Sequence, residues 1–184
     1  NTIMAFFSFC ITAGAVYIFN DIRDYKSDRL HPEKRNRPVA SGRVNFRSAR
    51  WLSAGLAVAG LLAAYTVSTS LYAILFTYLL LNIFYSWSLK KYTFPALLIV
   101  AAGYVLRVLA GAEAIGVAPS SWIIILTFLL SLLIGFNKKE IDLTLSNPDY
   151  PNRLHLQKIL TLTISAVVLI IYIAWSTTAG VQLR

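Results

Sequence analysis

Six long runs of apolar residues constrain the fold of this chain more than any other feature. Each run is close to the length of about 20 helical residues that crosses about 30 Å of hydrocarbon. Of the 184 residues, 57% are hydrophobic and 14% are charged, with a mean hydropathy of +0.63. These values exclude an ordinary soluble domain and a disordered chain. We therefore expect an all-α polytopic membrane protein with helices over residues 3–19, 49–67, 71–88, 94–114, 122–136 and 159–179.

The basic residues alternate between the connections that join these runs. Nine Lys and Arg lie in residues 20–50 and none in 68–70; Lys90 and Lys91 follow the third run, residues 115–121 contain none, and residues 137–158 contain four. Cytoplasmic connections of membrane proteins carry such an excess of Lys and Arg. The pattern predicts that the first, third and fifth connections face the cytoplasm and that both ends of the chain lie outside.

The charge of the first connection exceeds what orientation requires. The chain carries 17 Lys and Arg against 8 Asp and Glu, a formal net charge of +9, and nine of the cations share this connection. Nucleic acid is excluded as the partner because no basic platform or recognition helix lies outside the apolar runs. A single cysteine, Cys10, excludes an intramolecular disulfide and a Cys-rich metal site. The surplus of cations therefore indicates an anionic ligand.

Three aspartates stand at helical spacing where the first apolar run ends. Asp21, Asp24 and Asp28 are separated by three and four residues, so they share one face if the helix continues past Phe19, and Asn20 precedes Asp24 by four. Stacked like charges repel, whereas Mg²⁺ prefers oxygen ligands and fills its remaining positions with water and phosphate oxygens. The pattern predicts a Mg²⁺ site that attracts a diphosphate; the alternative is a solvated acidic helix end.

The same residues resemble a known family. The pattern Asn20-Asp21-x-x-Asp24-x-x-x-Asp28 resembles the first aspartate-rich motif of the UbiA-type intramembrane polyprenyl transferases. The continuation, with Arg29, His31, Pro32, Lys34, Arg35, Arg37, Pro38, Ala40, Ser41 and Gly42, resembles the branch that includes the decaprenyl-phosphate phosphoribosyltransferases. Residues 85–90 and 103–112 are also similar to segments of that branch.

This resemblance implies a fold of nine helices around a central cavity that opens to the membrane. Six helices are visible here, so we expect residues 1–184 to form a single transmembrane transferase domain that lacks one N-terminal helix and about two C-terminal helices. The resemblance also implies a multi-pass protein of a bacterial plasma membrane, with its active site facing the cytoplasm.

The activity implied is Mg²⁺-dependent transfer of a 5-phosphoribosyl group from phosphoribosyl diphosphate to a decaprenyl-type polyprenyl phosphate. Asp21, Asp24 and Asp28 would be the catalytic residues and the Mg²⁺ ligands. The expected substrate-binding residues are Asn20, Arg29, Lys34, Arg35, Arg37, Tyr85, Lys90, Arg107, Lys138, Lys139 and Glu140.

Two charged residues lie within or at the end of the fourth apolar run. Arg107 lies inside this apolar run, where a charge is costly, so it is expected to line a polar cavity; Glu113 is expected at a solvated helix end.

The second aspartate-rich motif of the family belongs on the fifth connection, where this chain has Glu140 and Asp142. Side chains two positions apart on an α-helix point about 200° apart around the helix axis, so these two cannot both face one metal. Glu140, which follows Lys138 and Lys139, suits a mixed phosphate and metal contact.

Other interpretations remain open at this stage. Ordinary prenyl transfer from a prenyl diphosphate to an aromatic or other small acceptor would use the same aspartates and metal. A carrier of lipid phosphates would bind the lipid without consuming a donor or needing Mg²⁺. Asn82 and Tyr85 share a helix face and either contact substrate or join helices, and the four tryptophans near the run ends suit interface anchors.

Overall fold

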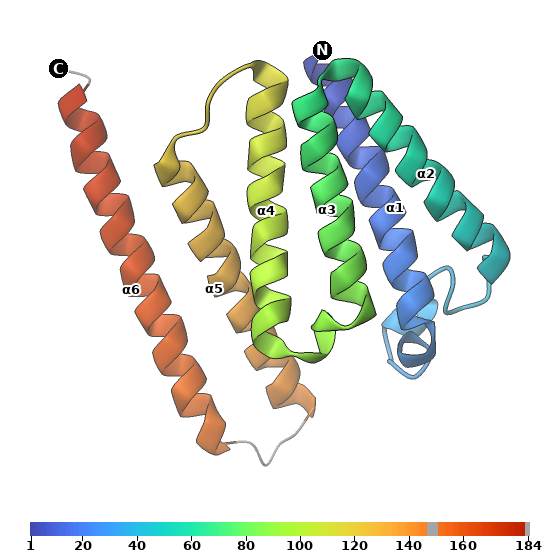
Figure 1. Ribbon diagram of the computed structural model, residues 1–184. Helices are drawn as coiled ribbons and strands as arrows, with labels where there is room; N and C mark the ends of the chain where they lie inside the picture. The colour runs from blue at the N-terminus through green and yellow to red at the C-terminus, as the bar shows by residue number, and fades with distance from the viewer. Residues whose placement is uncertain (147–150, 183–184) are drawn as a thin grey trace. The chain divides into compact units, whose positions relative to one another are not determined.

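The computed structural model confirms an all-helical chain (Figure 1). It describes the backbone of residues 1–146 and 151–182, and the side chains of residues 1–90, 92–138, 159 and 161–177. No strand occurs within those backbone ranges. The helices are α1 (Thr2–Asp28), α2 (Phe46–Val67), α3 (Thr69–Trp87), α4 (Thr93–Ile115), α5 (Ser121–Ser146) and α6 (Pro151–Gln182), with 3₁₀ turns η1 (Lys34–Asn36) and η2 (Leu89–Lys91).

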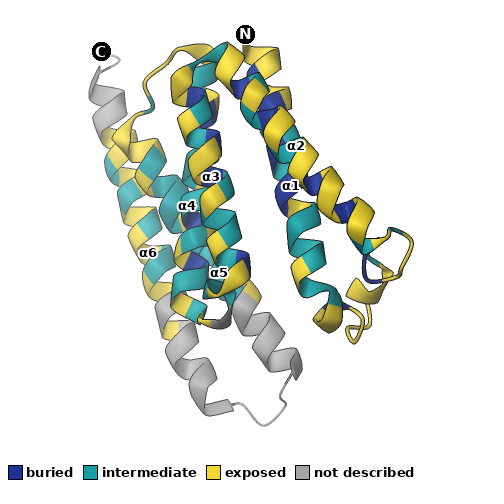
Figure 2. Ribbon diagram, turned by 45° about the vertical axis from the view of Figure 1, so that its right-hand side comes forward, coloured by how far each residue is buried: buried dark blue, intermediate teal, exposed yellow. Residues whose placement is uncertain are grey.

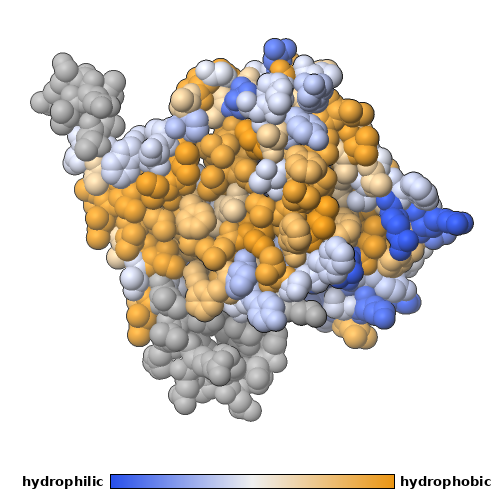
Figure 3. Space-filling view, in the orientation of Figure 1, coloured by the Kyte–Doolittle hydropathy of each residue, from blue (hydrophilic) through white to orange (hydrophobic). Residues whose placement is uncertain are grey.

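Five of these helices, α1 to α5, are long and apolar enough to cross a membrane. In α6 the described apolar stretch, Thr161–Thr177, is shorter. Large apolar side chains lie on the helix surfaces, which are mostly orange in Figure 3. Trp51 and Trp87, near helix ends, are 74% and 67% exposed, as interface anchors would be. The chain is an integral membrane protein, because such surfaces are stable only against lipid or further helices.

Helix α1 extends past residue 19 to Asp28 and includes the whole acidic segment. No Gly or Pro interrupts residues 20–28, so nothing in the local sequence breaks the helix there. The chain then turns at Arg29, and Pro32 follows, a residue that cannot continue a helix. The helical condition on which the predicted aspartate face depends is therefore met.

The chain divides into two compact units, which we describe separately. The first contains Asn1–Ala96 and Leu106–Ala118, and therefore α1, α2, α3 and both ends of α4. The second contains Leu97–Val105 and Pro119–Arg184.

Small residues bring α1 and α2 of the first unit together. Ser8 and Thr12 on α1 are fully buried, and Gly60 on α2 faces them. A Cβ added at Gly60 would lie 3.0 Å from the Thr12 amide nitrogen and 3.1 Å from the Ser8 carbonyl oxygen. The buried, dark-blue residues of these two helices are visible in Figure 2. Close approach through small residues is how helices associate when lipid supplies no hydrophobic drive.

Hydrogen bonds join the helix ends opposite the acidic segment. Ser68 begins α3, and its hydroxyl donates to a Glu113 carboxylate oxygen of α4 at 2.8 Å. Thr2 donates to the Ala114 carbonyl at 3.0 Å. Glu113, expected at a solvated helix end, is half-buried and instead connects α4 to α3.

In the second unit, α5 and α6 pack against each other. Gly135 of α5 lies against Leu97 of α4, where a Cβ would come within 2.6 Å of the leucine Cδ2. Helix α5 continues to Ser146, so Glu140 and Asp142 are on helical backbone as expected, but their side chains lie outside the described residues.

Candidate functional site

The last turns of α1 and the loop that follows form a cluster of charges. After α1 ends, the His31 ring nitrogen Nδ1 accepts hydrogen bonds from the amides of Glu33 and Lys34, at 3.2 and 3.4 Å. This caps the turn η1, after which Arg37 takes an extended conformation, with φ −60° and ψ 147°. The loop is thereby folded back on α1, and Arg37 returns to the aspartates.

Arg37 bridges two of the three aspartates. Its Nη1 donates to Asp21 Oδ1 at 3.1 Å and to Asp28 Oδ2 at 3.0 Å. One nitrogen therefore lies between carboxylates that are two helical turns apart. The Asp28 side chain is 6% exposed and that of Asp21 23% exposed, so both charges depend on this partner more than solvated carboxylates would.

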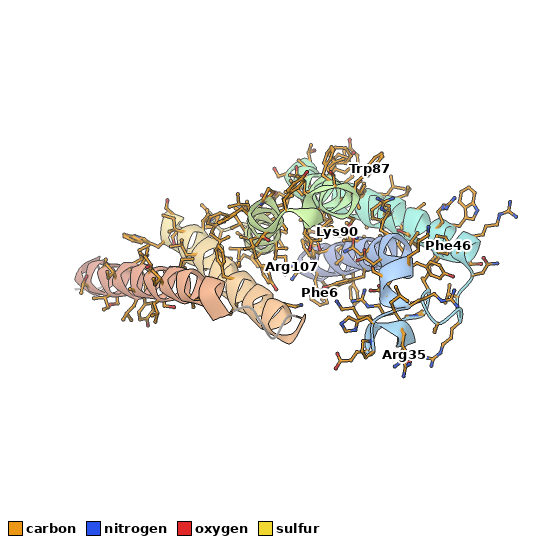
Figure 4. The ribbon with its side chains drawn as sticks, turned by 90° about the horizontal axis from the view of Figure 1, so that it is seen from below. Phe6, Arg35, Phe46, Trp87, Lys90 and Arg107 are labelled. Carbon is orange, nitrogen blue, oxygen red and sulfur yellow. The ribbon has the colours of Figure 1, made fainter. Side chains whose placement is uncertain are left out.

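The third aspartate is paired from a distant part of the sequence. Lys90 of η2 forms an ion pair with Asp24, and the hydroxyl of Ser86 in α3 donates to the Asn20 carboxamide oxygen (Figure 4 labels Lys90). Arg23 adds a hydrogen bond of 3.4 Å to the Trp87 carbonyl. The end of α3 and η2 therefore hold the acidic end of α1 through three polar contacts.

The carboxylates of the cluster are of the chemical type that a hard divalent cation prefers. No three His, Cys, Asp or Glu side chains of the described part of the chain are gathered closely enough to hold a metal ion as they stand. The carboxylates stay apart because like charges repel one another and because each of the three is paired with a cation of the protein. Asp21 Oδ1 and Asp28 Oδ2 nevertheless contact the same atom, Arg37 Nη1, at 3.1 and 3.0 Å. The distance between these two carboxylate oxygens therefore cannot exceed the sum of those two distances. Mg²⁺ takes such carboxylates together with water and phosphate oxygens.

The other predicted residues of the loop divide by position. Arg29 is held on Tyr25: its Nη1 donates to the phenol oxygen at 2.8 Å, and the guanidinium lies 5.4 Å from the ring centroid. Lys34 and Arg35 are exposed, and Figure 4 shows Arg35 at the periphery of the loop. They therefore remain accessible to an incoming anion.

Further predicted residues lie outside the cluster. Tyr85 is half-buried on α3, and Lys138 is exposed on α5 in the second unit. The predictions for Lys139 and Glu140 fall on side chains outside the described residues. Asn82 donates to the Tyr78 carbonyl of its own helix at 2.8 Å, so this contact does not join helices.

Arg107 lines a cavity of about 530 Å³ between α1 and α4 of the first unit. The wall is mostly apolar and also includes Phe9 and Tyr17. The guanidinium donates to the Tyr78 hydroxyl at 3.4 Å and lies 5.9 Å from the Phe9 ring centroid. Such contacts stabilise a cation that an apolar helix would otherwise expose to lipid. Arg107 therefore lines a cavity as expected, but the wall is mostly apolar where a polar one was expected. A role for Arg107 in binding remains a prediction.

Sequence reasoning did not assign the roles of Ser86 and Tyr78. Ser86 is 2% exposed and Tyr78 4% exposed, and each satisfies a polar residue of the cluster or cavity. The sequence shows only that a Ser and a Tyr lie inside an apolar run. Their partners, Asn20 and Arg107, come from other helices. Pairing of that kind is decided by packing.

Comparison with known proteins places this geometry in context. The profile of the UbiA prenyltransferase family matches residues 1–183. The decaprenyl-phosphate phosphoribosyltransferase of Mycolicibacterium smegmatis is 33% identical over 78% of this chain and 45% of its own length. That of Corynebacterium glutamicum is 31% identical over 77% and 43%. The digeranylgeranylglyceryl phosphate synthase of Sulfurisphaera tokodaii is 28% identical over 95% and 64%. The chain thus spans about half the length of the phosphoribosyltransferases it matches.

Proposed function

The chain belongs to the UbiA prenyltransferase family, and we propose that it carries the donor site of an enzyme that transfers 5-phosphoribosyl groups to a lipid phosphate. Members of this family are membrane transferases that generally depend on a divalent metal. The proposed donor is phosphoribosyl diphosphate, the proposed acceptor is a polyprenyl phosphate, and the proposed metal is Mg²⁺.

One observation carries this proposal: an acidic helix end is enclosed by a loop rich in cations. Asp21, Asp24 and Asp28 supply oxygen ligands, while Arg29, Lys34, Arg35 and Arg37 lie on the adjoining chain. A donor with a diphosphate and a separate 5-phosphate needs both kinds of group. The names of the phosphoribosyltransferase relatives point the same way.

The residues have distinct roles in the proposed reaction. Asp21, Asp24 and Asp28 would hold Mg²⁺, which neutralises charge on the departing diphosphate. Asn20, oriented by Ser86, would steady this end of α1. Arg35 and Arg37 would hold donor phosphates, because a guanidinium makes bidentate contacts with phosphate better than an ammonium does.

The bond changes need no protein base. The bond between ribose C1 and the diphosphate oxygen breaks, and an oxygen of the lipid phosphate forms the new bond to C1. The acceptor oxygen is already anionic near neutral pH. The described site offers His31 as its nearby imidazole, and that ring caps η1, which agrees with a reaction that moves no proton at the nucleophile.

A second candidate is favoured by one comparison. The synthase of S. tokodaii matches 95% of this chain, and its name is that of a lipid-forming enzyme and mentions no phosphoribosyl group. Transfer of a prenyl group from a prenyl diphosphate to a small acceptor would use the same aspartates. The additional cations after Asp28 favour the phosphorylated sugar donor over this alternative.

A product assay on the full-length protein separates the two. Purified enzyme with Mg²⁺ is offered phosphoribosyl diphosphate with polyprenyl phosphate, or a prenyl diphosphate with an aromatic acid, and the lipids are analysed by mass spectrometry. We expect the phosphoribosylated lipid phosphate and release of diphosphate. Turnover of the prenyl diphosphate alone would refute the proposal, and lipid binding without turnover would favour a carrier.

A further inference from the structure

The carboxylates proposed to hold a metal are already neutralised by cations of the protein itself. Arg37 contacts Asp21 and Asp28, and Lys90 contacts Asp24. We propose that Arg37 and Lys90 are exchangeable counterions, which close the acidic cluster to a free divalent cation and move to the donor's phosphates when metal and donor bind. This inference rests on the proposed function, because it requires a metal and a diphosphate at this cluster.

The geometry makes the two occupants mutually exclusive. Arg37 Nη1 lies 3.1 Å from one carboxylate oxygen and 3.0 Å from the other, so it fills the space between them. A metal bound to both oxygens would occupy that same space, and its charge would repel the guanidinium. Lys90 likewise contacts Asp24 Oδ1, one of the carboxylate oxygens that could ligate a metal. Metal binding between Asp21 and Asp28 therefore requires Arg37 to leave, and the charge of the metal would also repel Lys90 from Asp24.

The cations are better able to move than the carboxylates. Asp21, Asp24 and Asp28 are on the continuous helix α1, whereas Arg37 follows η1 in a loop and Lys90 lies in the short turn η2. The side chains of Arg37 and Lys90 are 39% and 31% exposed, so both reach the surface through long flexible stems. Rigid ligands beside mobile cations suit an exchange of partners.

Burial explains why the cluster exchanges cations and does not simply open. The Asp28 side chain is 6% exposed, and a buried carboxylate without a partner is strongly unfavourable. Asp28 therefore requires a positive partner at every stage. A diphosphate that arrives with the metal offers new anionic partners to Arg37 and Lys90, so metal and donor should bind cooperatively.

The test measures Mn²⁺ alone, without donor or acceptor. Full-length protein in detergent is titrated with Mn²⁺, and free Mn²⁺ is followed by electron paramagnetic resonance. Arg37→Gln removes the guanidinium and should bind Mn²⁺ about fivefold or more tightly than the wild type, a factor at the low end of typical coupling between ligands. Arg43→Gln is the matched control, because it removes one exposed cation from the same loop and should leave the Mn²⁺ affinity nearly unchanged.

A second arm measures the other half of the exchange. At saturating Mn²⁺, Arg37→Gln should bind phosphoribosyl diphosphate more weakly than the wild type, so the two affinities change in opposite directions. If Arg37→Gln does not fold, Lys90→Gln gives the same test through Asp24.

The possible results are distinct. Unchanged or weaker Mn²⁺ binding in the variant would overturn the inference and leave the metal site standing, as would unchanged donor affinity. Failure of the wild type and of every variant to bind Mn²⁺ would remove the metal site itself, and the proposed function with it.

Discussion

Neighbouring aspartates of one helix meet different surroundings in this protein. Asp28 is nearly buried and shares Arg37 with Asp21, whereas the Asp24 side chain is 29% exposed and pairs with Lys90. Loss of a buried partner would affect folding as well as binding. Asp24 is therefore the position at which a change of charge reports on chemistry with little effect on stability.

We expect Asp24→Asn to lower turnover by at least about a hundredfold, comparable with removing one transition-state contact in other enzymes. The amide keeps the size of the side chain and loses the negative charge that would hold the metal. Folding should change little, because a partly exposed ion pair contributes at most about 1 kcal/mol. Initial rates across a Mg²⁺ titration, with a melting curve for each protein, test this. Near-normal rates would leave the acidic turn as a solvated helix end.

Arg37→Ala tests which substrate this side chain meets. We expect kcat/KM for phosphoribosyl diphosphate to fall about tenfold to more than a hundredfold, the cost of one charge-assisted contact of roughly 1.5–3 kcal/mol. The KM for the lipid phosphate should change much less, because the contact is assigned to the donor. Steady-state kinetics with each substrate varied separately measure the two values. A rise confined to the lipid phosphate would reassign Arg37 to the acceptor.

At the scale of helices, α1 is both a membrane span and the carrier of the acidic cluster. Its buried small residues pack on α2, and Ser53 of α2 donates to the Ala15 carbonyl at 2.8 Å. The same rigid helix continues to Asp28. Packing in the apolar part therefore sets where the carboxylates lie.

Gly60 and Gly55 of α2 provide a matched pair for testing this packing. Gly60→Ala should destabilise the protein by about 1–3 kcal/mol, because its Cβ would press on the backbone of Ser8 and Thr12. A Cβ at Gly55 would have nothing within 4 Å, so Gly55→Ala should be neutral or stabilising by up to about 1 kcal/mol. Thermal unfolding in detergent, followed by circular dichroism, compares them. Equal melting temperatures would show that the close approach is not needed.

At the scale of the whole molecule, the distribution of basic residues among the connections predicts the orientation of the chain in the membrane. The loop between α1 and α2 and the turn η2 carry cations, and residues 137–158 carry four more, whereas the connections after α2 and α4 carry none. The proposed donor site belongs to the basic side. The orientation predicts that a soluble, charged donor reaches it from the cytoplasm.

Cysteine labelling in intact cells tests this orientation. In a Cys10→Ser background of the full-length protein, Ser41→Cys should resist an impermeant thiol reagent, and Ala118→Cys, in a connection without cations, should react. Both native residues are exposed, so accessibility differs only through the side of the membrane. Labelling of Ser41→Cys from outside would reverse the assigned topology.

The amino-acid sequence by itself determined the helices and the chemistry available at the end of α1. Apolar runs of membrane-spanning length have few alternatives in lipid, because the backbone must satisfy its own hydrogen bonds there. Likewise, Asp21, Asp24 and Asp28 share a face through helical spacing alone. Local rules of this kind need no knowledge of the rest of the chain.

Only the tertiary structure decided which cations meet these carboxylates. Arg37, expected to contact phosphate, bridges Asp21 and Asp28, and Lys90 reaches Asp24 across 66 positions of sequence. Seventeen Lys and Arg were available as partners, and spacing did not distinguish among them. The choice depends on how α1 packs against α3 and on the turn capped by His31, because ion pairs form between groups that folding has already brought together.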